Sequence, residues 1–210
     1  MKPYMLRSKI DVTGFRQSNG CTKKLHDLYW GHSFKSGNAK RKDGHTLNNL
    51  VLIGMPGAGK STVGVVIAKK LGYHFMDSDL VIQERTGKML HEIIEEKGTD
   101  GFLQVEGEIN ASLCCDRTVI ATGGSVVYSA KAMEHLKEIG SVVYLQLSYE
   151  AVPERLGDLQ ERGVALKEGQ TLRDLYEERT PLYEKYADIT LNCEGKMIRE
   201  VVAELAEKFV

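Results

Sequence analysis

The chain has 210 residues, of which 42% are hydrophobic and 27% charged, so it is long enough for one globular domain with a sizeable core. The charged fraction and a total of 21 glycines exclude a collagen-like chain, and only four prolines exclude a proline-rich linker. The formal net charge of −1 conceals an asymmetry. Residues 1–48 carry ten Lys and Arg against three Asp, a net charge of +7, whereas residues 49–210 carry 18 basic and 26 acidic residues, a net charge of −8.

The basic N-terminal segment, residues 1–48, shows no sustained period of 2 or 3.6, which predicts a largely disordered or loosely docked extension. It holds the only tryptophan, Trp30, and aromatic residues interleaved with basic ones can bind nucleic acid. No recognisable RNA- or DNA-binding module accompanies these charges, so a solvated extension is favoured over a nucleic-acid partner.

Compartment signals point to the cytoplasm. No apolar run approaches the roughly 18–20 residues that span a bilayer, and the N-terminus lacks the apolar core of a secretory signal. The four cysteines form no C-x-x-C pair, so neither a disulfide framework nor a zinc site is favoured. The adjacent Cys114 and Cys115 lie in a helix-like stretch and are expected to be small core residues. We expect a cytoplasmic protein, monomeric and without a membrane partner.

Five short apolar runs in residues 49–210 predict buried strands, and amphipathic stretches between them predict helices. The strands are expected at 50–53, 73–76, 119–121, 142–145 and 189–191, and the helices at 60–71, 89–97, 129–139 and 197–208. Strands that alternate with helices predict an α/β protein with a parallel sheet.

A glycine-rich loop separates the first predicted strand from the first helix. Residues 54–61 read GMPGAGKS, which matches G-x-x-x-x-G-K-[ST] between a strand and a helix. The glycines allow successive backbone N–H groups to surround a phosphate, Lys60 is expected to reach the β- and γ-phosphates, and Ser61 to bind Mg²⁺. The sequence therefore predicts an ATP and Mg²⁺ site. Its nucleotide-binding residues are expected to be Gly57, Ala58, Gly59, Lys60, Ser61 and Thr62.

Three classes of protein use such a loop: kinases, mechanical or regulatory NTPases, and binding modules without chemistry. The N-K-x-D motif of GTPases is absent, and the third strand ends in Ala-Thr-Gly-Gly instead of acidic residues. Asp77 and Asp79 follow the second strand, at the sheet edge where ligands bind. One carboxylate can hold a water of the Mg²⁺ shell while the other faces an acceptor hydroxyl. The alternative is that Asp79 caps a helix beginning near Leu80.

Taken together and in order, the segments GMPGAGKST, FMDSD, IIEEKG…F…E, ATGG and ERTPLYEKYAD resemble the shikimate kinase family across residues 49–210. That resemblance implies phosphorylation of a ring hydroxyl of shikimate with ATP and Mg²⁺. It also implies a P-loop NTPase fold of the nucleoside-monophosphate-kinase type. This fold is a three-layer sandwich whose five-stranded parallel sheet has the order 2-3-1-4-5, with a mobile lid expected at about 156–170.

The same resemblance implies roles for residues around the acceptor. Asp77 corresponds to the residue held near Mg²⁺ through water, and Asp79 to the carboxylate that orients or deprotonates the acceptor hydroxyl. Gly123 and Gly124 correspond to backbone that approaches the substrate ring closely, which a side chain would prevent. Arg179 corresponds to the arginine that binds the substrate carboxylate, its alternative being a surface helix arginine.

Two further arginines are implied in and beside the lid. Arg155 corresponds to the residue that stacks on adenine. Arg162 corresponds to the lid arginine that neutralises charge on the transferring phosphoryl group. The alternative for each is a solvated arginine.

Two departures from the family leave the acceptor open. The family's glycine triplet after the third strand ends here in Ser125, and its arginine after the substrate-helix phenylalanine is replaced by Leu103. No basic residue occurs from Thr99 through Asp116, and Gln104 can donate a hydrogen bond without neutralising charge. Shikimate is therefore the favoured acceptor. A gluconate-like hydroxy acid, homoserine, a nucleoside monophosphate, or a nucleotide-binding regulatory module remain the alternatives.

Overall fold

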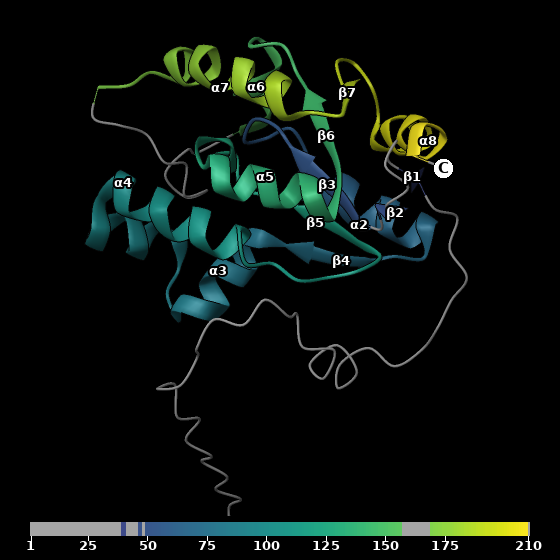
Figure 1. Cartoon of the computed structure of the whole chain (residues 1–210). Coiled ribbons are helices and arrows are strands. Elements are labelled where there is room, and N and C mark those ends of the chain that lie inside the picture. Colours follow the sequence, from purple (N-terminus) through teal and green to yellow (C-terminus); the bar gives the residue numbers. More distant parts are fainter. Residues whose placement is uncertain (1–38, 41–45, 48, 157–168, 210) are drawn as a thin grey trace, which may run out of the picture. The chain divides into compact units, whose positions relative to one another are not determined.

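The structure is a computed structural model that describes residues 39–40, 46–47, 49–156 and 169–209. Its centre is a parallel sheet of five strands in the order β4-β5-β3-β6-β7 (Figure 1). The strands are β3 (Asn49–Ile53), β4 (His74–Asp77), β5 (Thr118–Ala121), β6 (Gly140–Gln146) and β7 (Ile189–Asn192). Counted along the chain within this sheet, the order is 2-3-1-4-5, which confirms the prediction.

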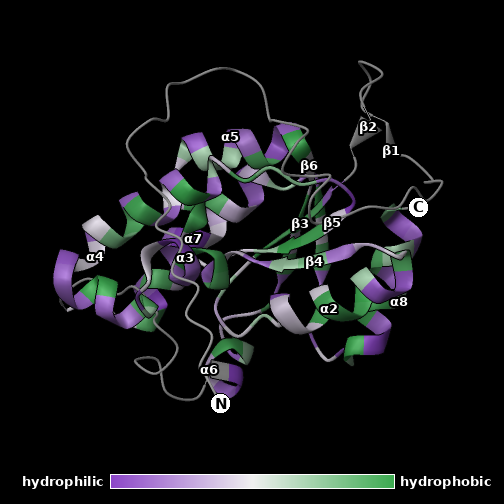
Figure 2. Cartoon of the chain, turned by 90° about the horizontal axis from the view of Figure 1, so that it is seen from below, coloured by the Kyte–Doolittle hydropathy of each residue, from purple (hydrophilic) through white to green (hydrophobic). Residues whose placement is uncertain are grey.

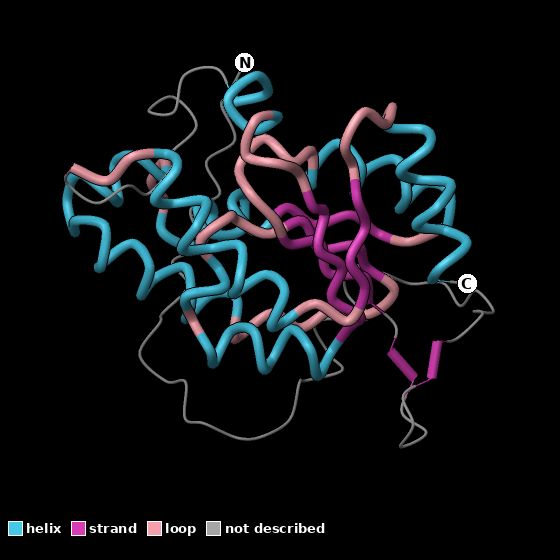
Figure 3. Tube along the Cα trace, turned by 90° about the horizontal axis from the view of Figure 1, so that it is seen from above, coloured by secondary structure: helices cyan, strands magenta, loops and turns pink. Residues whose placement is uncertain are grey.

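Helices cover both faces of the sheet and make three layers (Figure 3). The elements are α2 (Lys60–Leu71), α3 (Ser78–Thr86), α4 (Leu90–Asn110), the 3₁₀ turn η1 (Val126–Tyr128), α5 (Ala130–Ile139), α6 (Ala151–Leu156), α7 (Leu172–Tyr186) and α8 (Ile198–Phe209). Helices α2 and α8 pack together on one face, whereas α5 and α7 contact β6 and η1 on the other. Helix α3 follows β4 and packs on α4, which also contacts α5 and η1.

The two central strands carry no polar alternation because both of their faces are covered. Every residue of β3 and β5 is buried, and these strands are largely apolar in Figure 2. Parallel pairing aligns Val51 with Ile120 on one side and with Val142 on the other. The carboxyl ends of β3, β4 and β5 therefore meet at one edge of the sheet, where the loops that form the site begin.

Most predicted boundaries agree with the structure to within two residues, and α4 is the exception. A helix was expected over 89–97, but α4 continues to Asn110 across a kink at Gly98, whose φ of 71° and ψ of 175° are not helical. The second half of α4 therefore takes a direction different from the first and brings Phe102 and Glu106 into the interior.

Asn49 joins three parts of the sheet at the start of β3. Its buried side-chain Nδ2 donates to the carbonyls of Cys115 and Ile139, each at 2.9 Å, and its Oδ1 accepts from the Thr118 N–H at 3.0 Å. These bonds connect the first residue of β3 to the chain that enters β5 and β6.

We expect Asn49→Ala to lower the free energy of unfolding by about 2–5 kcal/mol, because three backbone groups at or just before the starts of β5 and β6 lose their partner. Urea unfolding followed by circular dichroism measures this loss. The exposed Glu207→Ala is the control and should change stability by less than about 0.5 kcal/mol. A loss of similar size in both variants would contradict the role given to Asn49.

Two findings differ from the expectations for the cysteines. Cys114 and Cys115 lie beyond the end of α4 in chain without helical structure, so the prediction that they are helical is wrong. Cys115 and Cys193 are free thiols, whereas Cys114 is disulfide-bonded, although the sequence did not favour a disulfide framework.

The N-terminal extension is described at two places only. Strands β1 (Ala39–Lys40) and β2 (Thr46–Leu47) pair antiparallel, a contact that the sequence did not predict. The other expectations for residues 1–48 lie outside the described residues, as do those for the lid between 157 and 168, including Arg162. Within the part of the chain that the structure describes, no helix has the length and apolar character needed to cross a membrane.

Candidate active site

The loop between β3 and α2 forms a preshaped cradle. Gly59 ends it in a left-handed conformation with φ of 87°, which a residue with a Cβ adopts only with strain. Lys60 begins α2 and is buried, and its Nζ donates to the carbonyls of Gly54 at 2.8 Å and Met55 at 3.0 Å. Burial lowers the pKa of Lys60 to about 8. The loop therefore holds a cation beneath the position expected for the phosphates.

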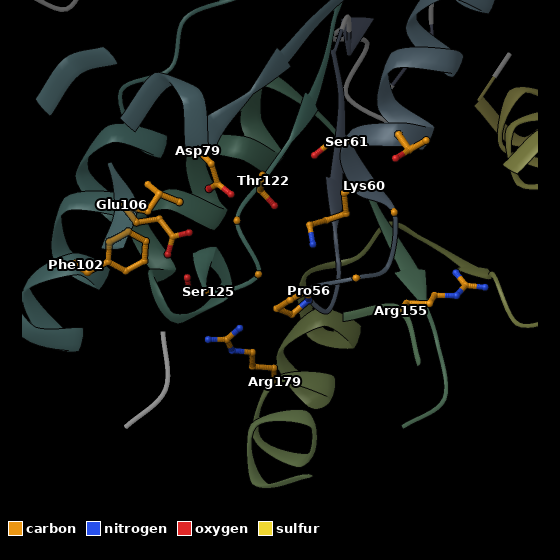
Figure 4. Close-up of a pocket in the computed structure, with 16 residues that line it drawn as sticks. Pro56, Lys60, Ser61, Asp79, Phe102, Glu106, Thr122, Ser125, Arg155 and Arg179 are labelled. Carbon is orange, nitrogen blue, oxygen red and sulfur yellow. The ribbon is translucent and has the colours of Figure 1, made fainter. Parts of the chain in front are cut away.

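A cavity of about 570 Å³ opens above this cradle (Figure 4). Its walls include ten of the residues that the sequence predicted, namely Gly57, Gly59, Lys60, Ser61, Thr62, Asp79, Gly123, Gly124, Arg155 and Arg179. Of the predicted residues that the structure describes, two do not line it. Ala58 is buried, and its N–H donates to the Met55 carbonyl at 3.1 Å within the loop. Asp77 accepts a hydrogen bond from the Ser61 hydroxyl at the edge of the cavity lining.

Ser61 and Asp77 form a set of oxygen atoms suited to a hard cation. The Ser61 Oγ donates to Asp77 Oδ2 at 2.7 Å, so a hydroxyl and a carboxylate from two different elements already lie together. Hydroxyl, carboxylate and water oxygens are the ligands that Mg²⁺ prefers in nucleotide sites. The residues present therefore fit Mg²⁺ bound beside the phosphate loop.

Asp77, and not Asp79, caps the helix that follows β4. Asp77 Oδ1 accepts from the Asp79 N–H at 3.0 Å, and α3 begins at Ser78. The alternative that Asp79 caps a helix beginning near Leu80 is therefore wrong. The Asp79 carboxyl is left to line the cavity, where burial and the nearby Asp77 raise its pKa to about 6.

Gly123 lies where two carboxyl groups come together. Its N–H donates to Ser78 Oγ at 3.3 Å, which fixes the loop after β5 against α3. A Cβ on Gly123 would lie 2.2 Å from Glu106 Oε1 and 2.9 Å from Asp79 Oδ1. No side chain larger than hydrogen fits, so the backbone itself forms this wall of the cavity.

Glu106 is the main residue that the sequence analysis did not assign. It is 1% exposed, lines the cavity from α4, and hydrogen bonds with the Ser125 side chain. Burial raises its pKa to about 7, with Asp79 adding to the shift and Ser125 opposing it. One feature of the sequence could have identified Glu106. Phe102, Glu106 and Asn110 are spaced by four and share one helix face, so the carboxyl group lies on the buried face of α4.

Arg179 is held at the opposite wall by residues of other elements. It is 1% exposed, its Nε donates to the Tyr128 hydroxyl at 3.2 Å, and its guanidinium lies 5.2 Å from the centre of that ring. A Cβ on Gly124 would come within 3.1 Å of Arg179 Nη1. The Tyr183 hydroxyl donates to the Gly124 carbonyl at 2.6 Å, which ties α7 to the loop after β5. The reading of Arg179 as a surface arginine is therefore wrong.

The two departures from the family pattern take different positions. Ser125 lines the main cavity and is bonded to Glu106. Leu103 instead lines a second cavity of about 340 Å³ and packs against a small apolar cluster that includes Phe102. Gln104 also faces this second cavity and donates to Glu108 at 2.9 Å, so it does not replace a cation in the main one.

Basic side chains of the described residues reach the main cavity at three positions, Lys60, Arg155 and Arg179. Arg155 is exposed and lies on the far side of the phosphate loop from Asp79 and Glu106 (Figure 4). The cavity therefore has two distinct ends, and among the described residues Arg179 is the buried arginine that lines it together with Asp79 and Glu106.

Comparison with known proteins agrees with this arrangement. The shikimate kinase family model matches residues 56–210. A shikimate kinase from Persephonella marina is 36% identical over 160 residues, which are 76% of this chain and 97% of that protein. One from Pseudomonas aeruginosa strain LESB58 is 39% identical over 163 residues, 76% of this chain and 95% of that protein.

Solved structures show the same similarity. A shikimate kinase from Acinetobacter baumannii in complex with shikimate has a TM-score of 0.69 and 33% identity, and the match covers 77% of this chain and 92% of that one. For the shikimate kinase from Aquifex aeolicus the TM-score is 0.62 and the identity 31%, with 76% and 94% covered. With its sheet order, phosphate loop and cavity, the chain belongs to the shikimate kinase family.

Proposed function

We propose that this enzyme transfers the γ-phosphoryl group of ATP to the 3-hydroxyl of shikimate, giving shikimate 3-phosphate and ADP. The observation that carries the proposal is the cavity itself, in which the phosphate loop and Lys60 face Asp79 and Arg179 across one space. Family membership and the similarity to a structure solved with shikimate support the same acceptor.

At the nucleotide end, the N–H groups of the loop and the N-terminus of α2 bind the phosphates, and Lys60 contacts the β- and γ-phosphates. Ser61 and Asp77 would hold Mg²⁺, Asp77 through a water molecule as the family resemblance implies. When bound, Mg²⁺ neutralises the charge of the phosphate oxygens. Thr62 continues the cradle, and Arg155 stacks on the adenine. Arg162, which lies outside the described residues, is proposed as the lid arginine on the transferring group.

At the acceptor end, Arg179 binds the carboxylate of shikimate, and the backbone of Gly123 and Gly124 supports the ring. Asp79 accepts a hydrogen bond from the acceptor hydroxyl and takes its proton as the oxygen attacks. The new bond joins the acceptor oxygen to the γ-phosphorus, and the bond from that phosphorus to the β,γ-bridging oxygen breaks. Most of the acceleration then comes from positioning and from charge compensation.

Direct measurement of ADP release tests the proposal. Purified protein with Mg²⁺ and ATP is assayed with shikimate, gluconate, homoserine, CMP and no acceptor. Turnover with shikimate well above every other reaction is the expected result. Turnover with another acceptor alone would keep the chemistry and change the substrate. ATP binding without turnover on any acceptor would support the regulatory module instead.

Arg179→Lys should raise the KM for shikimate about 10- to 100-fold, because an ammonium cannot make the paired hydrogen bonds of a guanidinium to a carboxylate. The KM for ATP should change less than about threefold, since Lys60 and the loop are untouched. Arg173→Lys, an exposed position in the same helix, serves as the control. Equal effects on both Michaelis constants would contradict the assigned role.

We also propose that the enzyme is an active monomer in the cytoplasm, where ATP is regenerated. The support for a monomer is that one chain supplies the phosphate loop, the two carboxyl groups and the buried arginine of the cavity. Size-exclusion chromatography with light scattering at assay concentrations measures the oligomeric state directly.

A further inference from the structure

The acceptor end of the cavity holds two carboxyl groups where one suffices for chemistry. Glu106 Oε1 and Asp79 Oδ1 both lie within 3 Å of the point where a Cβ on Gly123 would be. Asp79 follows β4 and is assigned to the reacting hydroxyl, whereas Glu106 comes from the second half of α4 and has no role in the chemistry described above. Figure 4 shows both side chains on the same wall of the cavity.

One oxygen of Glu106 is left for a ligand. Glu106 Oε1 is buried and has no hydrogen-bond partner among the residues that the structure describes. Buried carboxyl oxygens almost always have partners, because an unpaired one costs about 1–3 kcal/mol. The Ser125 hydroxyl bonds to the carboxyl group, so Ser125 fixes Glu106 without satisfying Oε1. The remaining oxygen adjoins the space that the acceptor is proposed to fill.

Charged groups from three other elements influence the protonation state of Glu106. Asp79 of α3 disfavours a second negative charge, whereas Lys60 of α2 and Arg179 of α7 favour it. Lys60 is held by two carbonyls of the phosphate loop, and Arg179 is the residue proposed above to bind the acceptor carboxylate. With Leu103 turned to another cavity, α4 supplies no cation here. An arriving carboxylate therefore adds negative charge beside Glu106 and Asp79, which favours the protonated form of Glu106.

We propose that Glu106 is a binding residue of the acceptor site. It acts there as a neutral carboxylic acid and donates a hydrogen bond through its unpaired oxygen. Binding of an anionic acceptor is therefore coupled to uptake of a proton by Glu106. Ser125 positions this acid. The inference rests on the proposed function, because it assumes an acceptor with a carboxylate. It explains how a site with one buried arginine holds an anion next to two acidic residues.

The coupling has a definite direction with pH. Glu106, with a pKa of about 7 in the free enzyme, is largely protonated below pH 7 and largely ionised above pH 8. The carboxyl group of shikimate is ionised throughout this range, since such groups titrate near pH 4. If only the protonated enzyme binds, the KM for shikimate rises about 30-fold between pH 6.0 and 8.5.

The test compares the wild type, Glu106→Gln and Ser125→Ala for the KM of shikimate from pH 6.0 to 8.5. Glutamine mimics the neutral acid, so its KM should lose the rise above pH 7. Removing the Ser125 hydroxyl removes a bond that favours the ionised form, so the rise should move to higher pH in Ser125→Ala. Calorimetry of shikimate binding in two buffers of different ionisation enthalpy should show uptake of about half a proton at pH 7 in the wild type and none in Glu106→Gln.

A KM that does not depend on pH in the wild type, or one that rises equally in Glu106→Gln, would overturn the inference. If Glu106→Gln does not fold, an unchanged profile in Ser125→Ala would overturn it as well. Absence of shikimate turnover at every pH is a separate result and would refute the proposed function. If shikimate is phosphorylated but its KM does not change with pH, the proposed function remains and only the role of Glu106 is refuted.

Discussion

Replacing Lys60 with alanine should reduce kcat by at least about 10³-fold, with little change in thermal stability. The ammonium lies beneath the phosphate loop in a buried position, where compensation of transition-state charge by one group is worth about 4 kcal/mol. ADP release under saturating substrates measures the loss. The two carbonyls that accept from Lys60 can bind water instead, so the melting temperature should stay close to that of the wild type.

Lys69→Ala is the matched control, because this lysine is exposed in the last turn of the same helix. It should retain the full rate. A large fall in melting temperature for Lys60→Ala would mean that the ammonium holds the loop together, and the lost rate would then have a structural cause.

Asp79→Asn should lower kcat about 10²- to 10⁴-fold and change the KM for ATP less than about threefold. Asparagine keeps the shape of the side chain and can still contact the acceptor hydroxyl, but it cannot take the proton. Steady-state kinetics with ATP varied at saturating shikimate separates the two constants. Because Asp77 and not Asp79 caps α3, the substitution leaves the helix start intact.

Asp100→Asn, at an exposed position of α4, controls for the change of charge. It should leave kcat within about twofold of the wild type. If Asp79→Asn weakened ATP binding as much as it slowed turnover, Asp79 would belong to the nucleotide site and not to the acceptor hydroxyl.

The phosphate loop could be predicted from sequence because its physics is local. Eight consecutive residues, GMPGAGKS, determine the left-handed turn, the start of α2 and the position of Lys60, and no distant contact is needed to interpret them. The central strands are equally readable, since β3 and β5 are apolar after their first residues, Asn49 and Thr118. The sheet order was predicted from the family resemblance and not from periodicity, because no pattern within a parallel strand indicates which other strands it pairs with.

The acceptor wall could not be predicted in the same way, because its geometry is tertiary. Glu106 and Ser125 meet only because the kink at Gly98 redirects α4 toward the loop after β5. The same redirection turns Leu103 and Gln104 toward the second cavity, so their sequence position beside Phe102 did not reveal which space they face. The sequence shows Gly98 as a glycine within a helical pattern. Such a glycine indicates that the helix is interrupted, but it does not indicate the direction in which the helix continues.

The attachment of α7 also limits how the specificity of such an enzyme can evolve. Tyr183 stacks on Tyr144 of β6 with ring centres 5.1 Å apart, and its hydroxyl holds the loop that carries Gly124, one turn from Arg179 on the same helix. A mutation that shifts α7 to suit a new acceptor would move that loop as well and would disturb phosphoryl transfer. Position 103 on α4 instead faces the second cavity, so it can change without moving that loop.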